Sequence, residues 1–155
     1  MCLKTTKQLP PIKDLKLSAT EIAWLAGLFE GEASFLLDQR SKQRYTVSTS
    51  PSNPYVSIQM TDEDVIAKVA KLLDKTYLVS KRKTSRAKSV YKVYVGDRAT
   101  LRYLLPLLFP YLGKRRQHDV QLGLNALNEW ETWYLEGGRS KMDKLGPKSK
   151  KLNKN

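Results

Sequence analysis

Acidic residues at the end of a glycine-bearing apolar segment are the side chains of this sequence best suited to chemistry. Glu30 and Glu32 lie near the end of the stretch 25–33, and carboxylates are the ligands that hard divalent cations prefer. Gly27 and Gly31 lie four residues apart and therefore share one face of a helix. Because each glycine costs roughly 1 kcal/mol relative to alanine inside a helix, we expect a compensating close contact between two such helices. Two copies packed through these glycines would bring their carboxylates together as a two-centre metal site.

The same stretch, Leu25-Ala26-Gly27-Leu28-Phe29-Glu30-Gly31-Glu32-Ala33, resembles the LAGLIDADG motif of the homing endonucleases. The leucine-alanine-glycine start, the apolar pair and the acid-small-acid-small ending follow the order of the motif. Both acids are Glu where Asp is more frequent, and Ala33 replaces the commoner final glycine. The resemblance implies an intron-encoded enzyme with a single motif per chain that works as a homodimer. The residues at the dimer interface would be Leu25, Gly27, Leu28 and Gly31.

The resemblance also implies roles for the acids of the motif. Glu32 matches the family's metal-binding acid, and the peptide carbonyl of Gly31 is an additional ligand. Glu30 matches an acid that holds the end of the motif through local hydrogen bonds. Retention of both carboxylates is consistent with an active enzyme.

Two further residues are candidates for the catalytic centre. Lys114 begins a segment that resembles the family's K-x-x-Q, in which the lysine faces the metal centre and can neutralise charge on the phosphate. Arg115 takes that role if the register slips by one residue, and the alternative is a basic helix start on the surface. Asp62 either orders water or caps the following helix, and the sequence leaves these two interpretations equal.

The charge balance indicates a polyanionic partner. Across 155 residues, 28 Lys and Arg stand against 15 Asp and Glu, and the formal net charge is +13. Nucleic acid is the first candidate. A membrane is the competitor, but no apolar run reaches the roughly 18 residues of a spanning helix, and the N-terminus lacks an apolar signal core. We therefore expect a soluble, intracellular protein, and the resemblance implies one made in an organelle or in an archaeal cytoplasm.

The content of cysteine and histidine limits the kind of metal site. Cys2 is the single cysteine and His118 the single histidine, so neither an internal disulfide nor a Cys/His zinc cluster is available. A metal must therefore bind oxygen ligands, which favours Mg²⁺ or Mn²⁺. We expect His118 to be an ordinary surface residue rather than a general base, since a metal makes one unnecessary.

Apolar periodicity and capping residues predict one domain, 17–138, between a flexible N-terminal arm, 1–16, and a basic C-terminal tail, 139–155. Ser18 and Glu21 form a capping box before the first helix, and Asp97 caps a later one. The expected elements are a helix over 19–31, strands over 33–40 and 55–60, a helix over 61–74, strands over 77–83 and 89–95, and helices over 97–109 and 114–136. This order predicts an α+β fold, α-β-β-α-β-β-α, whose four-stranded antiparallel sheet carries its helices on one face. The resemblance implies the same fold.

The strand residues predict a surface for duplex DNA. The segment 76–95 and the loop 39–53 hold several basic residues and no acid, whereas a solvated hairpin usually mixes signs. An antiparallel ribbon fits the major groove, where strand side chains contact base edges while hairpin tips bind phosphates. The expected DNA-contacting residues are Ser34, Leu36, Asp38, Arg40, Lys42, Arg44, Ser57, Gln59, Lys81, Arg82, Lys83, Lys92, Tyr94 and Arg115. In contrast, the spacing of Trp130, Trp133 and Tyr134 favours core packing over base stacking.

Together these features predict a metal-dependent, sequence-specific endonuclease for double-stranded DNA that acts as a homodimer, and the resemblance implies staggered cuts with 3′ overhangs. The alternative is an RNA-binding maturase that assists splicing of the intron, since the same scaffold can bind introns. The retained Glu32 argues for cutting. A transcription regulator ranks last, because regulators on this scaffold carry an additional helix-turn-helix domain for which this chain is too short.

Overall fold

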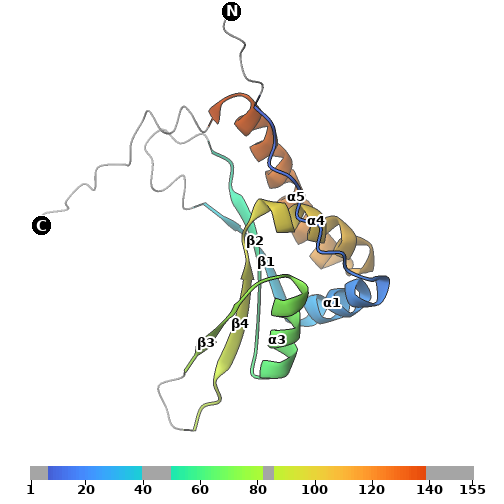
Figure 1. Cartoon of the computed structure of the whole chain (residues 1–155), viewed down its shortest axis with the longest axis vertical. Helices are drawn as coiled ribbons and strands as arrows, with labels where there is room; N and C mark the ends of the chain where they lie inside the picture. The colour runs from blue at the N-terminus through green and yellow to red at the C-terminus, as the bar shows by residue number, and fades with distance from the viewer. Residues whose placement is uncertain (1–6, 40–49, 82–85, 139–155) are drawn as a thin grey trace, which may run out of the picture.

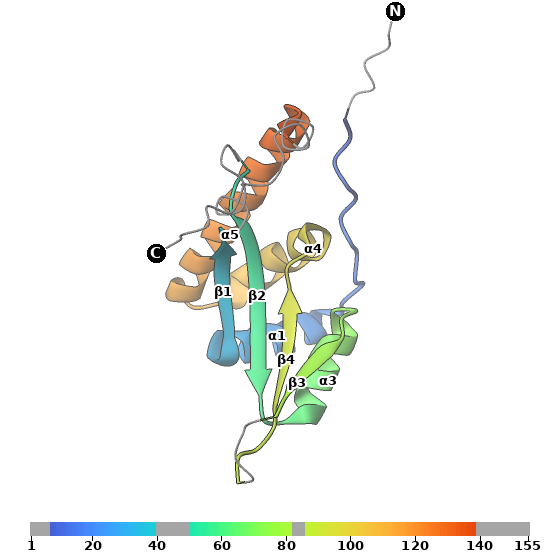
Figure 2. The same cartoon turned by 90° about the vertical axis from the view of Figure 1, so that its left-hand side faces the viewer.

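A computed structural model describes residues 7–39, 50–81 and 86–138. They form one antiparallel sheet with a layer of helices on one of its faces (Figures 1 and 2). The elements are α1 (Ala19–Glu32), β1 (Ala33–Asp38), β2 (Asn53–Met60), α3 (Glu63–Leu72), β3 (Tyr77–Ser80), β4 (Val90–Val95), α4 (Arg98–Leu108), the 3-10 turn η1 (Phe109–Tyr111) and α5 (Lys114–Leu135). The predicted α+β fold, with four strands and helices on one face, is confirmed.

The strands lie in the order β1-β2-β4-β3, and every neighbouring pair is antiparallel. Ile58 in β2 faces Val93 in β4, which in turn faces Tyr77 in β3. Because side chains alternate between the faces of a strand, this register places Ile58 and Val93 under the helices, where both are buried. The residues on either side of Ile58, Ser57 and Gln59, lie on the opposite face, which no helix covers (Figure 2).

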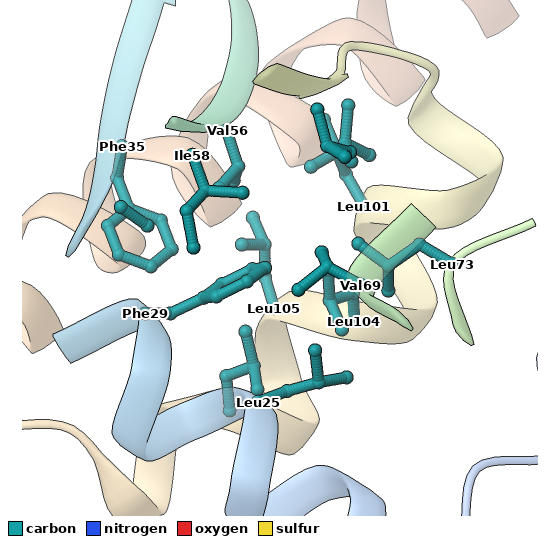
Figure 3. Close-up of a cluster of buried hydrophobic side chains, with 14 of the residues drawn as sticks. Leu25, Phe29, Phe35, Val56, Ile58, Val69, Leu73, Leu101, Leu104 and Leu105 are labelled. Carbon is teal, nitrogen blue, oxygen red and sulfur yellow. The ribbon is translucent and has the colours of Figure 1, made fainter. Parts of the chain in front are cut away.

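The core lies between the sheet and the helices. Phe29 of α1 points into a cluster of aliphatic side chains from β2, α3 and α4, and its ring meets that of Phe35 edge-on at 6.4 Å between centroids (Figure 3). Leu25 and Leu104 are fully buried in the same cluster. Burial of each such side chain contributes about 1.5–3 kcal/mol, so the buried side of α1 is fixed by the chain's own core.

Two predicted helix caps are confirmed. The Ser18 hydroxyl accepts from the backbone N–H of Glu21 at 3.2 Å, and the Glu21 carboxylate accepts from the Ser18 N–H at 2.8 Å. The Asp97 carboxylate accepts from the backbone N–H of Thr100 at 3.0 Å. These bonds satisfy donors that a helix leaves unpaired at its N-terminus, and they explain why α1 and α4 begin where the sequence predicts.

Other boundaries differ from the prediction. The strand β2 begins at Asn53, inside the expected loop, because Pro54 pairs only with Leu37 of β1 and lies beyond the end of β4, where its missing N–H is tolerated. The helix α3 ends at Leu72 rather than 74, because Asp74 adopts a left-handed φ of 51°. The strand β1 ends at Asp38 and β3 at Ser80, each before the end expected from the sequence.

Residues 7–16, which belong to the predicted arm over 1–16, run along the helices and contact them (Figure 1). The backbone N–H of Lys13 donates to the carbonyl of Ala99 at 3.0 Å, and that of Leu17 donates to the Tyr103 hydroxyl at 3.0 Å. Leu15 and Leu17 pack against the core. These contacts follow no regular spacing, so the apolar periodicity of the sequence does not predict them. We refer to α1, α3, α4 and α5 with this segment as the helix layer.

Residues 1–6 and the predicted tail, 139–155, lie outside the described part of the chain. In the ranges that are described, no helix is both long enough and apolar enough to cross a membrane.

Candidate metal site and nucleic-acid interface

The end of α1 presents one carboxylate without a partner. Glu32 is the last residue of α1, and Ala33, which is buried, turns into extended backbone at φ −85° and ψ 154° to start β1. The Glu32 side chain is exposed and makes no hydrogen bond or ion pair with any described residue. Gly31 beside it is exposed as well. The helix-to-strand junction therefore leaves oxygen ligands available to something outside the chain.

Glu30, in contrast, is engaged by the start of α5. Its carboxylate accepts from the backbone N–H of Gly113 at 2.9 Å, and its backbone carbonyl accepts from Nε of Arg116 at 3.2 Å. A Cβ at position 113 would lie 3.1 Å from a Glu30 oxygen, so glycine suits this junction. Glu30 thus holds the end of the motif, as its resemblance implies. Sequence reasoning missed Gly113 and Arg116, whose only signal was their proximity to Lys114.

Lys114 and Arg115 occupy the first turn of α5 and are both exposed. Since Gly113 is bonded to Glu30, these two cations lie beside the end of α1. Like charges at a helix N-terminus are unfavourable, and neither residue pairs with an acid among the described residues. Their position is consistent with an anion supplied from outside, and it leaves open which of the two would contact it.

Asp62 lies at the same end of the sheet as Glu32. The strand β1 begins where Ala33 faces Ile58, and β2 then ends at Met60, two residues before Asp62. The Asp62 side chain stands at the N-cap of α3 but makes no capping hydrogen bond. The capping interpretation therefore has no support. Within the described residues no hydrogen bond or ion pair joins Asp62 to Glu32 or Lys114.

The proposed interface residues divide into two groups. Gly27 and Gly31 are exposed, and a Cβ at either would meet nothing within 4 Å. Leu28 is half-buried and packs against the core. The assignment of Leu25 to the interface is wrong, because its side chain is 0% exposed within the single chain. The two glycines therefore form an open stripe on α1 that the chain itself does not fill.

The residues present fit a hard divalent cation only in part within one chain. Among the described residues no group of three His, Cys, Asp or Glu side chains lies close enough to hold a metal. The available donors are the Glu32 carboxylate and the Gly31 carbonyl, both oxygen. This set suits Mg²⁺, which keeps several waters and takes one or two carboxylates together with substrate phosphates.

The uncovered side of the sheet, here called the open face, carries most of the predicted base-contacting residues in cross-strand rows. Ser34, Ser57 and Tyr94 form one row, and Gln59 and Lys92 the next. The residues of the open face are Ser34, Leu36, Asp38, Asn53, Tyr55, Ser57, Gln59, Leu78, Ser80, Val90, Lys92 and Tyr94. The Tyr94 ring lies against that of Tyr55 at 5.1 Å between centroids. Sequence reasoning missed Leu78, because β3 lacks polar alternation.

Basic side chains at one end of this face have no acidic partner. Lys81, Arg86 and Lys88 are exposed around the connection between β3 and β4, and no ion pair involves them within the described residues. Five predicted DNA contacts lie outside the described residues: Arg40, Lys42, Arg44, Arg82 and Lys83. The chain enters β2 from β1 at Asn53, whereas β3 ends and β4 begins beside the other end of β2, where Met60 faces Tyr91. The 8 residues of β2 span about 27 Å.

The aromatic residues of α5 serve packing. Trp130 is buried and stacks on Tyr134 at 4.8 Å between ring centroids, and the guanidinium of Arg98 lies 4.3 Å from the Trp130 ring. His118 is exposed. The expectation of core packing is confirmed for Trp130.

Comparison with solved structures gives similar chains among DNA-bound endonucleases. The homing endonuclease I-CvuI in complex with the I-CreI target has a TM-score of 0.55 at 20% identity over 86% of each chain. The group I intron-encoded homing endonuclease I-CeuI complexed with DNA has a TM-score of 0.55 at 16% identity, and the match covers 79% of this chain and 60% of that one. The LAGLIDADG meganuclease I-CpaMI bound to uncleaved DNA has a TM-score of 0.54 at 18% identity, and the match covers 76% of this chain and 41% of that one. At these identities the likeness shows the fold.

No curated protein matches the sequence. Residues 19–107, more than half of the chain, match the model of the LAGLIDADG-like domain. This range begins at the first residue of α1 and ends within α4, so it contains the motif helix, the whole sheet and the unpaired Glu32. The chain belongs to the LAGLIDADG-like domain family.

Proposed function

We propose that this chain is a sequence-specific endonuclease for double-stranded DNA, dependent on Mg²⁺ or Mn²⁺, that acts as a homodimer and leaves 3′ overhangs. The observation that carries the proposal is the unpaired Glu32 carboxylate, placed between the open glycine stripe of α1 and the basic start of α5. An exposed carboxylate beside exposed cations offers oxygen to a metal ion and positive charge to a phosphate, which are the two groups that metal-assisted hydrolysis of a phosphodiester brings together.

DNA as the partner is supported by charge and by likeness. The basic residues Lys81, Arg86 and Lys88 pair with no acid in the described ranges of the chain, and phosphates are the groups that neutralise such a surface. I-CvuI and I-CeuI, which share the fold, were solved with DNA. I-CvuI was solved in the presence of Mg with the DNA not cleaved, and with its target in the presence of Ca.

A homodimer is supported by the incomplete site. One chain offers Glu32 and Gly31 as ligands, whereas cutting both strands needs two such centres. Gly27 and Gly31 leave room for a second α1 at close distance. The I-CpaMI chain, of which this chain covers 41%, has room for two such domains, which suggests that one domain is half of the working unit.

The residues then divide the work. A bound divalent ion would activate water and stabilise charge on the phosphate oxygens. Glu32 and the Gly31 carbonyl hold that ion, and Lys114 neutralises charge that develops on the phosphate. Asp62 positions water at the same end of the sheet. Glu30 contacts no substrate and instead fixes the start of α5 through Gly113.

The direct test is cleavage by the full chain. Purified protein with Mg²⁺ is incubated with duplex DNA of its coding locus from which the intron has been removed, and the ends are mapped. We expect a double-strand break with 3′ overhangs. Glu32→Gln should abolish cutting and keep DNA affinity, because it removes a negative charge near phosphates. Wild-type cutting by this variant would reject the assignment of Glu32.

Two neighbouring cations provide a matched comparison. Lys114→Ala should lower the cleavage rate about a hundredfold, the loss typical of a removed transition-state donor, with a smaller change in binding. A larger loss of cleavage rate in Arg115→Ala than in Lys114→Ala would assign the role to Arg115 instead. Tighter binding to the structured intron RNA than to the DNA, without cutting, would favour the maturase and overturn the proposal.

A further inference from the structure

Leu78 is the most exposed large apolar side chain in the described part of the molecule, with 67% of its surface accessible. It lies on β3 directly across from Lys92, which itself faces Gln59 on β2. The three side chains form one row across the open face, apolar, cationic and amide in order. No described residue covers Leu78, so its side chain is available to a partner that binds the open face.

The surroundings of Leu78 define the chemistry of that partner. Lys81, Arg86, Lys88 and Lys92 lie on the same hairpin, and no acid occurs in β3 or β4. A second copy of the chain docked on the free edge of β3 would bring two such basic hairpins together, which like-charge repulsion opposes. A polyanion that also offers an apolar group fits both features. In the major groove of duplex DNA, that group is the 5-methyl of thymine.

We propose that Leu78 contacts the 5-methyl group of a thymine in the target duplex and thereby selects that base; this rests on the proposed DNA-binding function. Neighbouring strands lie about 4.8 Å apart, somewhat more than the rise of about 3.4 Å per base pair. The thymine therefore lies one or two base pairs from the base that Lys92 contacts, and guanine is the base that a lysine prefers there.

Uracil provides the test, because it pairs like thymine and lacks only the methyl group. Duplexes are selected from a random library with the full chain carrying Glu32→Gln, so that bound DNA stays intact. Each thymine of the selected duplex is then replaced by uracil, one at a time. At one position per half-site we expect about fourfold weaker binding, the equivalent of one buried methyl group. Adding Leu78→Ala should remove the difference between thymine and uracil at that position.

Val79 is the matched control, since it is the next residue of β3, is 49% exposed and points to the other face. Val79→Ala should keep the full uracil effect. Thermal melting checks that Leu78→Ala folds, as expected for an exposed position.

The outcomes separate the two proposals. If no duplex is enriched, both the DNA-binding function and the role of Leu78 are rejected. If a duplex is enriched but uracil weakens binding equally with and without Leu78, only this inference fails. A change in sedimentation of Leu78→Ala without DNA would identify a contact between protein chains and would also overturn it.

Discussion

Basic side chains of the open face and of the helix layer have different surroundings within one chain. In the helix layer, Lys13 pairs with Asp74 at 2.7 Å and Arg102 pairs with Glu131, while Lys68 lies 4.1 Å from the Trp24 ring centroid. Lys16 and Lys71 are exceptions there, and so are Lys114 and Arg115 at the start of α5, beside the candidate metal site. On the open face and in the adjoining connection, the basic residues lack such partners among the described residues. They are Lys81, Arg86, Lys88 and Lys92.

These surroundings distinguish charges that stabilise the fold from charges that are available to a partner. A cation that meets an acid or an aromatic ring inside the chain adds to folding stability, and its loss should leave partner binding unchanged. A cation without such a partner adds repulsion to the folded state, and its benefit must come from outside. The same division separates Glu30 from Glu32, two acids of one motif. Substitution of a group that is paired within the chain should therefore change stability, and substitution of an unpaired group should change partner binding.

The largest effect is expected for Gly27→Leu, on the open stripe of α1. A Cβ at Gly27 meets nothing within 4 Å in the chain, so the single chain should keep its stability or gain up to about 1 kcal/mol. In a symmetric dimer the added side chain enters the interface twice and costs about 1–3 kcal/mol each time. The dimer affinity should therefore fall at least about thirtyfold. Sedimentation equilibrium measures this. Asn125→Leu, at an exposed site of α5, should have no effect, and an intact Gly27→Leu dimer would reject the interface.

Two arginines, one paired and one unpaired, should differ in their effect on stability. Arg102 is 12% exposed and pairs with Glu131, so Arg102→Ala leaves a half-buried acid unpaired and should lower the free energy of unfolding by about 2–3 kcal/mol. Arg86 is exposed and forms no ion pair with a described residue. Arg86→Ala should change the free energy of unfolding by less than about 0.5 kcal/mol. Urea denaturation distinguishes them. Equal losses would mean that pairing within the helix layer contributes no more than surface charge.

Two lysines, one unpaired and one paired, should differ in their effect on DNA binding. Lys81→Ala should flatten the dependence of log affinity on log salt by about 0.9 per protomer, as for one lost phosphate contact, without changing the preferred sequence. Lys75, which follows α3, is paired at 2.5 Å with Asp97, the N-cap of α4, and Lys75→Ala should leave that slope unchanged. Titrations of labelled duplex between 50 and 200 mM salt measure the slope for both variants. Over this range, one phosphate contact changes the affinity about threefold. A flatter slope for Lys75→Ala would show that a cation paired within the chain also contacts phosphate, which would contradict this division.

The smallest effect concerns pH. Partial burial raises the pKa of the Asp97 carboxyl, but hydrogen bonds from Lys75 and Thr100 outweigh it and hold the pKa below its ordinary value. The stability from this group is therefore present above the unfolded pKa of about 3.9 and is lost as the pH falls through the lower folded value. Because Asp97 is 42% exposed, the loss should stay under about 1 kcal/mol.

Asp97→Asn keeps an oxygen for the Thr100 N–H and removes the titration. Urea denaturation below pH 4 should show a shallower loss of stability in this variant than in the parent, and Lys75→Met should show the same. An unchanged pH profile would mean that the ion pair adds nothing to the helix layer.

Local signals in the sequence were sufficient for much of the fold. The capping box at Ser18 and the cap at Asp97 depend on residues three positions apart, so their physics is contained in the sequence. The alternation of β1 placed Ser34 and Leu36 on the open face because a strand has a fixed period of two. The irregular segment 7–16 could not be predicted, since its hydrogen bonds to Ala99 and Tyr103 join residues far apart in the chain.

The sequence by itself determined the family, the element order and the pair of acids in the motif, because these follow from residue types at fixed spacing. The packing of elements distant in the sequence determined which motif residues are used within the chain and which are left for a partner. It paired Glu30 with Gly113 and left Glu32 free, buried Leu25 and left Gly27 open, and placed Leu78 uncovered beside Lys92. The physical reason is that burial and hydrogen bonding depend on neighbours from other elements, and no local spacing encodes which neighbours those will be.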